Sequence, residues 1–413
     1  MAVVKPFRAV RPHPDYAHLI AELPYDVMNT AEAKKMAAGN PYSFLRIDRP
    51  EINFPDPVDP YQPQVYAEAN RILQQMIADN QYIMDQHDCL YIYRQIMDGR
   101  AQTGLVCCTS VDDYLNGVIK KHEHTRPEKE IDRANHVQAL NAHTGPILQT
   151  YPDHEEIAAL ISSWTETHEP VYRFTAHQVE QIVWVVDQAD VVTKIRTLFA
   201  EEVPYLYIAD GHHRSAAAMR TALMKREENP DYSGDEEFNY FLSVVFPASE
   251  LKIMSYNRVV RDLNSLPEQE FLARIQERFE VVTAPSQPYQ PETPHTFGMY
   301  LGSTWYKLTI KPELIPVDDP VNRLDAALLQ NNLLEPVLGI VDPRTDERID
   351  FIGGIRGLKE LERRVHTDMQ VAFSLYPTAV EEVIAVADAG LVMPPKSTWF
   401  EPKLLSGLFV HKI

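Results

Sequence analysis

The sequence has few cysteines and no long apolar run. Its 413 residues include only Cys89, Cys107 and Cys108, which form neither a disulfide framework nor a zinc-binding pattern. Such sparse use of cysteine is typical of a reducing compartment. No stretch approaches the roughly 18 apolar residues of a membrane span, and the first residues lack the apolar core of a signal peptide. We therefore expect a cytoplasmic protein with no membrane partner.

Basic side chains are also scarce relative to acidic ones. The chain has 39 Lys and Arg against 59 Asp and Glu, a formal net charge of −20. A surface of that sign repels the phosphate backbone of nucleic acids, so we expect no nucleic-acid partner. The remaining composition, 45% hydrophobic and 24% charged, is that of an ordinary globular protein with a sizeable core. A homo-oligomer is compatible with these numbers.

The pattern of apolar runs predicts an α/β fold with mixed α+β character. Strands and helices alternate in the middle of the chain, which is typical of an α/β layer: helix 155–166, strand 181–187, helix 191–202, strand 204–209 and helix 214–226. Asp98-Gly99 and Gly302-Ser303 predict the turns of two β-hairpins. We expect a first domain over 1–261, an α+β domain over 262–375, and a segment 376–413 that returns to the functional site.

One polar cluster interrupts this pattern where a strand meets a helix. In "YIADGHHRSAAAMR", residues 207–220, an apolar run ends in Asp210, Gly211, His212, His213 and Arg214. A helix N-terminus offers unpaired amides and a positive dipole end, and a glycine there lets an anion approach. The arginine supplies a two-pronged donor for phosphate oxygens. The cluster therefore predicts a phosphate-binding site.

The other three residues of the cluster allow several roles. His212 and His213 could hold phosphate or transfer a proton. Asp210 could hold a magnesium ion, orient a histidine or act as a base. Alternatively, Asp210 is a helix N-cap and the histidines are surface residues.

A second cluster of charged residues, "KKHEHTRPEKEIDR", occupies residues 120–133. It does not match the His-Glu-x-x-His pattern of metalloproteases. Glu123 is a candidate general base, and Lys129 and Arg133 are candidate phosphate ligands. The alternative is a solvated charged helix.

Three further segments contain candidate residues. In "MPPKSTWFEPKLLSG", Lys396, Ser397 and Thr398 follow two prolines and could bind an anion, unless the segment is a tail anchored by its aromatic residues. Asp26 in "LPYDV" is either a catalytic or metal-binding carboxylate or part of an Asx-turn. Arg258 in "YNRVV" is either an anion ligand or a surface strand residue.

The motif "ADGHHRSAAA" resembles the nucleotide-binding signature of the ParB/sulfiredoxin superfamily, and its Asp-Gly-His-x-Arg form is similar to that of the free-serine kinases. Nearly the whole chain resembles the DUF1015 family, through "KPFRAV", "PYDV", "NPYSFLRI", "HEHTRPEKEIDR", "GPI", "IADGHHR", "YNRVV" and "MPPKSTWFEPKL". The resemblance implies a ParB/sulfiredoxin-like nucleotide-binding core within 1–261.

The resemblance also implies a kinase that uses ATP or ADP with Mg²⁺. Its substrate would be a small hydroxyl-bearing metabolite, and free L-serine is the expectation that the signature favours. Gly211, His212, His213 and Arg214 would hold phosphates, Asp210 would hold magnesium or steer a histidine, and Glu123 would be the base. This chain departs from the small serine kinases in its length and its N-terminal region, which puts the base in doubt. Alternatives are a nucleotide-binding or nucleotide-hydrolysing switch of ParB-like type, a phosphatase acting on a phosphorylated metabolite such as phosphoserine and, least favoured, DNA partition.

Overall fold

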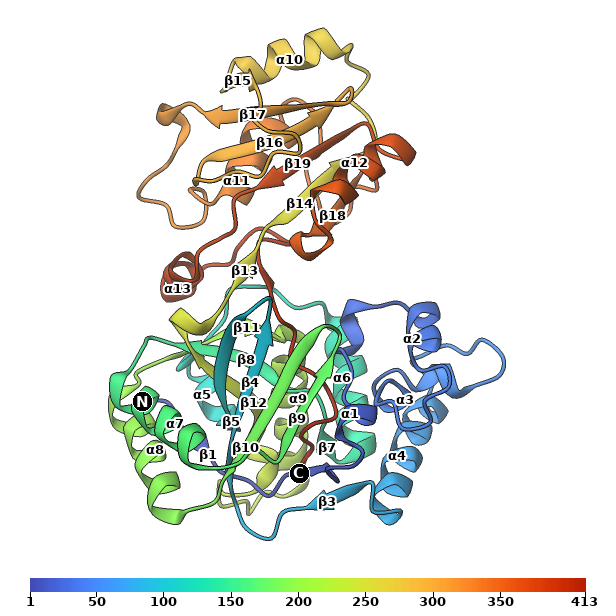
Figure 1. The fold of residues 1–413 in the computed structure, drawn as a ribbon, viewed down its shortest axis with the longest axis vertical. Helices are drawn as coiled ribbons and strands as arrows, with labels where there is room; N and C mark the ends of the chain where they lie inside the picture. The colour runs from blue at the N-terminus through green and yellow to red at the C-terminus, as the bar shows by residue number, and fades with distance from the viewer. The chain divides into compact units, whose positions relative to one another are not determined.

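The structure is a computed structural model that describes residues 1–413 (Figure 1). The chain divides into two compact units. The first consists of Met1–Leu251 together with Pro402–Ile413, and the second of Lys252–Glu401. Both units contain helices and sheets, so the predicted mixed α/β fold class is confirmed.

A nine-stranded mixed sheet forms the centre of the first unit. Its strands follow the order β6 (Ile119–Lys120), β11 (Leu206–Asp210), β8 (Ile147–Tyr151), β12 (Tyr240–Pro247), β5 (Arg100–Ser110), β4 (Leu90–Met97), β10 (Val179–Val186) and β9 (Tyr172–Ala176), with β1 (Val4–Lys5) on β5. The pairs β6–β11 and β8–β12 are parallel, and the other pairs are antiparallel. The parallel pairs lie around β11, the strand that leads into the polar cluster.

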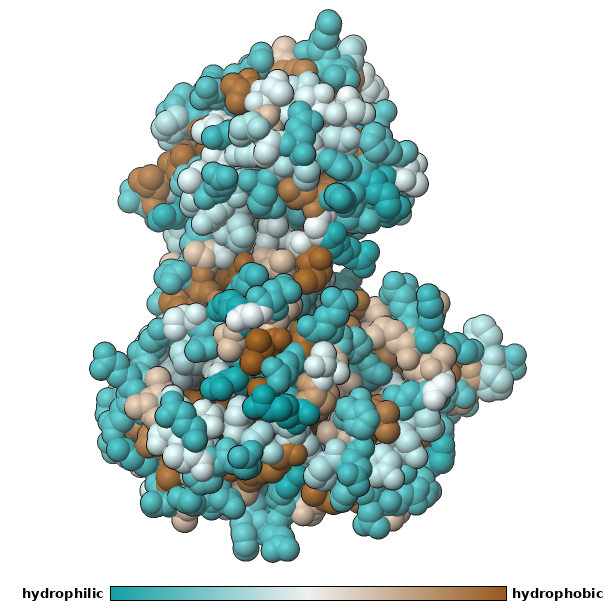
Figure 2. Space-filling view, viewed as in Figure 1, coloured by the Kyte–Doolittle hydropathy of each residue, from teal (hydrophilic) through white to brown (hydrophobic).

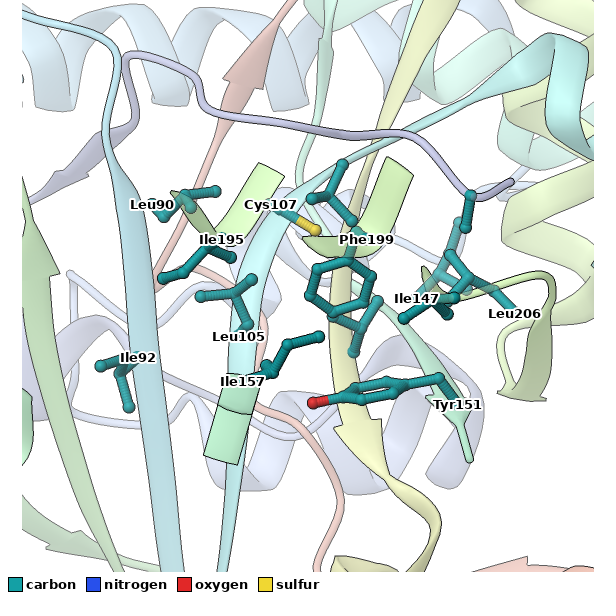
Figure 3. Packing of buried hydrophobic residues seen from close by; sticks show 14 of the residues in the cluster. Leu90, Ile92, Leu105, Cys107, Ile147, Tyr151, Ile157, Ile195, Phe199 and Leu206 are labelled. Atoms are coloured by element: carbon teal, nitrogen blue, oxygen red, sulfur yellow. The ribbon is translucent and has the colours of Figure 1, made fainter. Parts of the chain in front are cut away.

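Helices of the first unit pack on this sheet and against one another. They are α1 (Ala17–Ile20), α2 (Thr30–Met36), α3 (Leu45–Asp48), α4 (Pro63–Ala78), α5 (Val111–Leu115), α6 (Pro127–Leu140), α7 (Glu155–Thr167), α8 (Ala189–Glu202) and α9 (His212–Glu228). Figure 3 shows Ile157 of α7 and Phe199 of α8 packed against Leu105 and Cys107 of β5. Helix α9 packs beside α6, which brings the two predicted charged clusters together.

Residues 402–413 complete the first unit rather than fraying. β21 (His411–Lys412) pairs with β7 (Ala142–His143), and Val410 bridges to Val10 in β2 (Val10–Pro12), whose other partner is β3 (Tyr82–Met84). The ring of Phe409 is 5.3 Å from that of Tyr91. A buried apolar cluster that includes Val410 fixes this segment.

The second unit contains a six-stranded antiparallel sheet. Its order is β15 (Phe279–Thr283), β17 (Thr304–Ile310), β16 (Thr296–Leu301), β19 (Val371–Leu375), β14 (Tyr256–Val260) and β18 (Ile349–Gly353). One face is covered by α10 (Glu268–Gln276) and α11 (Asp325–Leu329), and the other by α12 (Leu358–Thr367). The unit also contains α13 (Val380–Asp388) and the pair β13 (Ile253–Met254) and β20 (Trp399–Phe400).

Local turn chemistry explains several elements. Asp98 and Gly99 have φ values of 52° and 79°, and Gly302 and Ser303 have 52° and 67°, so both predicted hairpin turns are confirmed. Six short 3-10 turns connect other elements: Tyr25–Val27, Pro50–Asn53, Glu237–Asn239, Ala248–Glu250, Pro312–Leu314 and Gly354–Arg356.

The division of the chain differs from the predicted ranges 1–261, 262–375 and 376–413. Strand β14 pairs with β18 and β19, which places it in the second unit although the sequence pattern favoured the first. Residues 376–401 also belong to the second unit, and only 402–413 return to the first. The pairing partners that set this division lie far away in the sequence.

The surface of the units agrees with the composition. Figure 2 shows that hydrophilic residues cover most of the visible face of each unit. Among the described residues, 1–413, no helix is both long enough and apolar enough to cross a membrane.

Candidate functional site

The predicted cluster lies at the junction between β11 and α9. Gly211 adopts φ 101° and ψ 28°, a left-handed conformation that a glycine takes without steric cost. It occupies the N-cap position of the 17-residue helix α9, and no side chain caps the helix. The first-turn amides therefore lack a side-chain acceptor and point toward any anion placed at this end. Asp210 is not the N-cap, and α9 begins at His212 rather than at the predicted Arg214.

Arg214 fills the space that the missing side chain of Gly211 leaves. A Cβ built on Gly211 would lie 3.2 Å from Nε of Arg214 and 3.3 Å from its Cζ. The glycine thus makes room for a guanidinium, whereas the sequence suggested that it makes room for the phosphate directly.

The guanidinium of Arg214 is held by few protein acceptors. Its Nη1 donates to the carbonyl of Pro146, and its Nη2 is 3.8 Å from Oδ2 of Asp210. Nε is buried and has no hydrogen-bond partner. Burial alone would lower the pKa of Arg214, but the carboxylates of Asp26 and Asp210 hold this pKa above its usual value. The side chain is charged and retains a donor for a ligand.

Lys403 is a site residue that the sequence reasoning missed. Its ammonium donates to Oδ2 of Asp210 at 3.2 Å. Burial raises the pKa of Asp210, but Lys403 and Arg214 outweigh that effect and hold this pKa well below its usual range. Lys403 lies within the motif "MPPKSTWFEPKLLSG", where attention to the Lys-Ser-Thr triplet led instead to Lys396. The only feature of the sequence that could have indicated Lys403 is that it is the second lysine of this motif.

His212 and Glu123 lie next to each other. Nδ1 of His212 is 3.6 Å from Oε2 of Glu123, and Nε2 accepts a hydrogen bond from the amide of His122 at 3.5 Å. The rings of His122 and His212 meet edge to face at 4.5 Å. Burial, and then the neighbouring His122, holds the pKa of His212 well below its usual value, so this imidazole is neutral at pH 7. The Glu123 side chain is 46% exposed and accessible to a substrate.

His213 holds the loop that precedes α6. Its Nε2 accepts a hydrogen bond from the amide of Arg126 at 3.1 Å, which requires the neutral ring. Burial and the charge of Arg126 lower the pKa of His213. Lys129, in the first turns of α6, donates to the hydroxyl of Tyr61 at 2.9 Å. The contacts of these two side chains are therefore with neighbouring parts of the protein.

Arg133 and Arg214 line one small cavity of about 30 Å³, large enough for a water molecule. Arg133 is buried, its Nε is 3.0 Å from Oδ2 of Asp132, and its guanidinium lies 4.1 Å from the centre of the Tyr25 ring. The cavity is also lined by polar residues that the sequence analysis did not select: Tyr25, Asp48, His136, Thr144 and Ser406. These residues lie far apart in the sequence, so the sequence did not indicate that they line the same cavity.

Asp26 is an exposed residue of the 3-10 turn Tyr25–Val27. After burial, its carboxylate is the strongest influence on the pKa of Arg214, which it raises. Its charge also partly opposes the lowering of the His213 pKa by burial and Arg126. Asp26 and Glu123 are thus two carboxylates that interact with residues of the "DGHHR" motif.

Lys396, Ser397, Thr398 and Arg258 belong to the second unit. Lys396 has φ 58°, and the hydroxyl of Ser397 donates to the carbonyl of Pro394 at 2.7 Å. Arg258 is buried in β14, so the alternative of a surface strand residue is wrong.

The acidic and histidine side chains do not form a ready metal centre. Among residues 1–413, no group of three or more His, Cys, Asp or Glu side chains is arranged to hold a metal ion. Oδ2 of Asp210 lies 3.2 Å from Nζ of Lys403 and 3.8 Å from Nη2 of Arg214.

The fold and the site together are those of an α/β protein with a cluster of cationic and acidic side chains at a strand–helix junction. The chain belongs to the family described as "Protein of unknown function (DUF1015)", which matches residues 4–327. The predicted membership of this family is confirmed. A comparison with curated proteins found no match.

Several solved structures are similar to the chain at low identity. SbnI with a C-terminal truncation, from Staphylococcus aureus, is 13% identical and has a TM-score of 0.38; the match covers 73% of this chain and 85% of that one. A free serine kinase in complex with AMP is 15% identical, with a TM-score of 0.34 and coverage of 74% and 89%. A conserved hypothetical protein from Pyrococcus furiosus is 13% identical, with a TM-score of 0.33 and coverage of 73% and 94%. At these TM-scores the neighbours do not define the activity of this chain.

Proposed function

We propose that this protein is a small-molecule kinase that transfers a phosphoryl group from ATP or ADP to a hydroxyl group. One observation carries the proposal: helix α9 has no side-chain cap, and the buried Nε of Arg214 beside it has no acceptor. Buried donors without partners are costly, and a phosphate oxygen would satisfy them. The site lies at a strand–helix junction, where phosphate groups are bound in many α/β proteins.

The charges around α9 suit a phosphoryl group in transfer. Arg214 supplies a fixed positive charge, and Lys403 supplies a second one through its contact with Asp210. Negative charge that develops on the transferred group is stabilised by such prepositioned donors. Asp210 stays ionised over the physiological pH range, because these two cations lower its pKa.

Magnesium would be held by Asp210 together with the nucleotide phosphates. The donor type fits this arrangement, since magnesium prefers carboxylate oxygens and needs few protein ligands when phosphates are present. When bound, the ion neutralises phosphate charge. Asp210 itself would orient the nucleotide end against Arg214.

Glu123 is the proposed base for the substrate hydroxyl. It is half-exposed, and it contacts the neutral ring of His212, whose orientation the amide of His122 fixes. Asp26 is the second candidate, because it influences Arg214 and His213 from another segment. Free L-serine is the proposed acceptor, and it rests on the similarity of the Asp-Gly-His-x-Arg motif to that of the free-serine kinases.

The test is to incubate the full chain with ATP or ADP, Mg²⁺ and each of a panel of amino acids, and to follow phosphorus NMR. Formation of phosphoserine only with serine present supports the proposal. Nucleotide hydrolysis that needs no acceptor would instead indicate a switch protein, and phosphate release from phosphoserine alone would indicate a phosphatase. Either result overturns the kinase.

Variants separate the phosphate site from the base. Arg214→Ala should weaken nucleotide binding, measured by calorimetry, by roughly ten- to a hundredfold, the value of hydrogen bonds to a charged group. Arg220→Ala, an exposed position in the same helix, is the matched control and should change little. Glu123→Gln should reduce the turnover rate with little effect on nucleotide affinity. If Asp26→Asn has that effect and Glu123→Gln does not, Asp26 is the base.

A further inference from the structure

Arg258 lies inside the second unit, on a strand that has neighbours on both sides. Strand β14 pairs with β18 and β19, and Arg258 is opposite Phe351 and Phe373 in these pairs. It lies on the same face of β14 as Val260, which packs in the apolar cluster under α10 and α11. Only 3% of Arg258 is exposed. A guanidinium therefore occupies a position where an aliphatic side chain would be expected.

No carboxylate compensates the charge of Arg258. Its Nη1 donates to the carbonyl of Tyr256, and its guanidinium lies 5.3 Å from the centre of the Phe351 ring. The other two guanidinium nitrogens, Nε and Nη2, donate to no protein atom, and no acidic side chain is within ion-pair distance. Burial lowers the pKa of Arg258 to about 10, so the group still carries its charge at neutral pH. A buried charge without a partner is strongly unfavourable unless a ligand supplies the opposite charge.

A cavity of about 310 Å³ adjoins this guanidinium, and all its lining residues belong to the second unit. Its volume is in the range of small-molecule sites. Ala326, Leu334, Phe351 and Pro394 give it apolar walls. Such walls suit the body of an organic ligand rather than a bare inorganic ion.

The remaining charged residues of the cavity cancel each other. Arg344 and Asp342 form a two-pronged ion pair, with Nε–Oδ1 and Nη2–Oδ2 distances both of 2.9 Å. Gln330 supports the wall by donating to the carbonyl of Ile340 at 2.7 Å. The cavity therefore contains one uncompensated positive charge, that of Arg258, which matches a single negative charge on a ligand.

We propose that this cavity binds a small monocarboxylate with an apolar body, whose carboxylate pairs with Nε and Nη2 of Arg258. The planar guanidinium fork matches the two oxygens of a carboxylate. A phosphate dianion would bring more negative charge than Arg258 compensates. The site takes a different ligand from the proposed nucleotide, and it does not depend on the proposed kinase activity.

The test is calorimetric titration of the full chain with hexanoate, and with hexanamide as the neutral analogue of the same shape. Hexanoate should bind, and hexanamide should bind at least about tenfold more weakly. Arg258→Met should abolish hexanoate binding. Arg363→Met removes an exposed arginine from α12 of the same unit and should leave binding unchanged. Equal binding of hexanoate and hexanamide, or binding that survives Arg258→Met, would overturn the proposal.

Two further measurements keep the proposal testable if Arg258→Met does not fold. In crystals of the unaltered chain soaked with 6-bromohexanoate, the anomalous bromine signal should lie in the Arg258 cavity, and a signal only elsewhere contradicts the site. Titration with inorganic phosphate should give no competition with hexanoate. Displacement of hexanoate by phosphate at comparable concentration would overturn the assignment to a carboxylate.

Discussion

Two glycines with the same φ value allow the effect of backbone strain to be distinguished from the effect of side-chain packing at the candidate site. Gly211 and Gly234 both have φ 101°, but a Cβ at Gly211 would lie 3.2 Å from Nε of Arg214, whereas nothing lies within 4 Å of a Cβ at Gly234. Gly234→Ala should destabilise the protein by about 1–2 kcal/mol through backbone strain alone. Gly211→Ala should cost more and should also weaken nucleotide binding, because Arg214 must move.

Urea denaturation of the two variants, with calorimetry of nucleotide binding, measures these effects. If Gly211→Ala is no more destabilising than Gly234→Ala and binds nucleotide normally, the packing of Arg214 against Gly211 has no role in the site.

The buried His122 makes stability depend on pH. Burial lowers the pKa of His122 from 6.5 to about 4. Between these two pH values the imidazole is therefore protonated in the unfolded chain but stays neutral in the folded protein. This contribution is fully present above pH 6.5 and is lost as the pH falls toward 4, by up to about 1.4 kcal/mol per pH unit. Urea titrations from pH 7 to pH 4.5 should show a shallower fall for His122→Gln than for the unaltered chain. The exposed His87→Gln is the control, and parallel curves for all three proteins would contradict the prediction.

At the scale of elements, local chemistry allowed three helices of the first unit and two hairpin turns to be predicted. Asp98-Gly99 specifies its turn through its own φ values, and α7 and α8 lie where the apolar spacing placed them. The order of strands was not predictable in this way. It depends on contacts such as β8 with β12 and β14 with β18, which join segments far apart in the chain.

In the candidate site, too, features set by neighbouring residues were predictable from the sequence, whereas contacts between segments far apart in the chain were not. The proposed anion binding by residues 210–214 rests on local sequence alone: a strand, a glycine and a helix that follow one another. The side chains that contact this segment could not be predicted from its local sequence. Lys403 reaches Asp210 because the segment 402–413 is anchored by strand pairing, and Arg133 meets Tyr25 because α6 packs beside the N-terminal region.

The anchoring of the segment 402–413 can be tested at Phe409. Its ring packs against Tyr91 and Tyr93, with centroids 5.3 Å and 6.2 Å away. Phe409→Ala should destabilise the protein by about 3–5 kcal/mol, the usual cost of removing a buried aromatic side chain. It should also weaken nucleotide binding, since Lys403 belongs to the same segment. The half-buried Phe238→Ala should cost less in urea denaturation, and a Phe409 variant of normal stability would show that the segment is not anchored there.

At the scale of the whole molecule, the second unit is an insertion into the first. Its two ends meet: the amide of Glu401 donates to the carbonyl of Lys252 at 3.1 Å, and Ile253 pairs with Phe400. Replacing residues 252–401 by a short Gly-Ser linker should therefore leave the first unit folded, because its nine-stranded sheet lies entirely outside the deleted range. A dispersed amide NMR spectrum would support this expectation, and an unfolded or aggregated product would contradict it.

The insertion has a consequence for how the protein is made. Residues 402–413 leave the ribosome only after all of 252–401 has been synthesised, yet they supply Val410 to a buried cluster of the first unit and Lys403 to Asp210. Folding of the first unit therefore cannot be completed, and the apolar surface that Val410 covers stays exposed, while the second unit is synthesised. A chain whose translation stops early would therefore lack the lysine that contacts Asp210 at the proposed phosphate-binding site, and its exposed apolar surface would mark it for degradation.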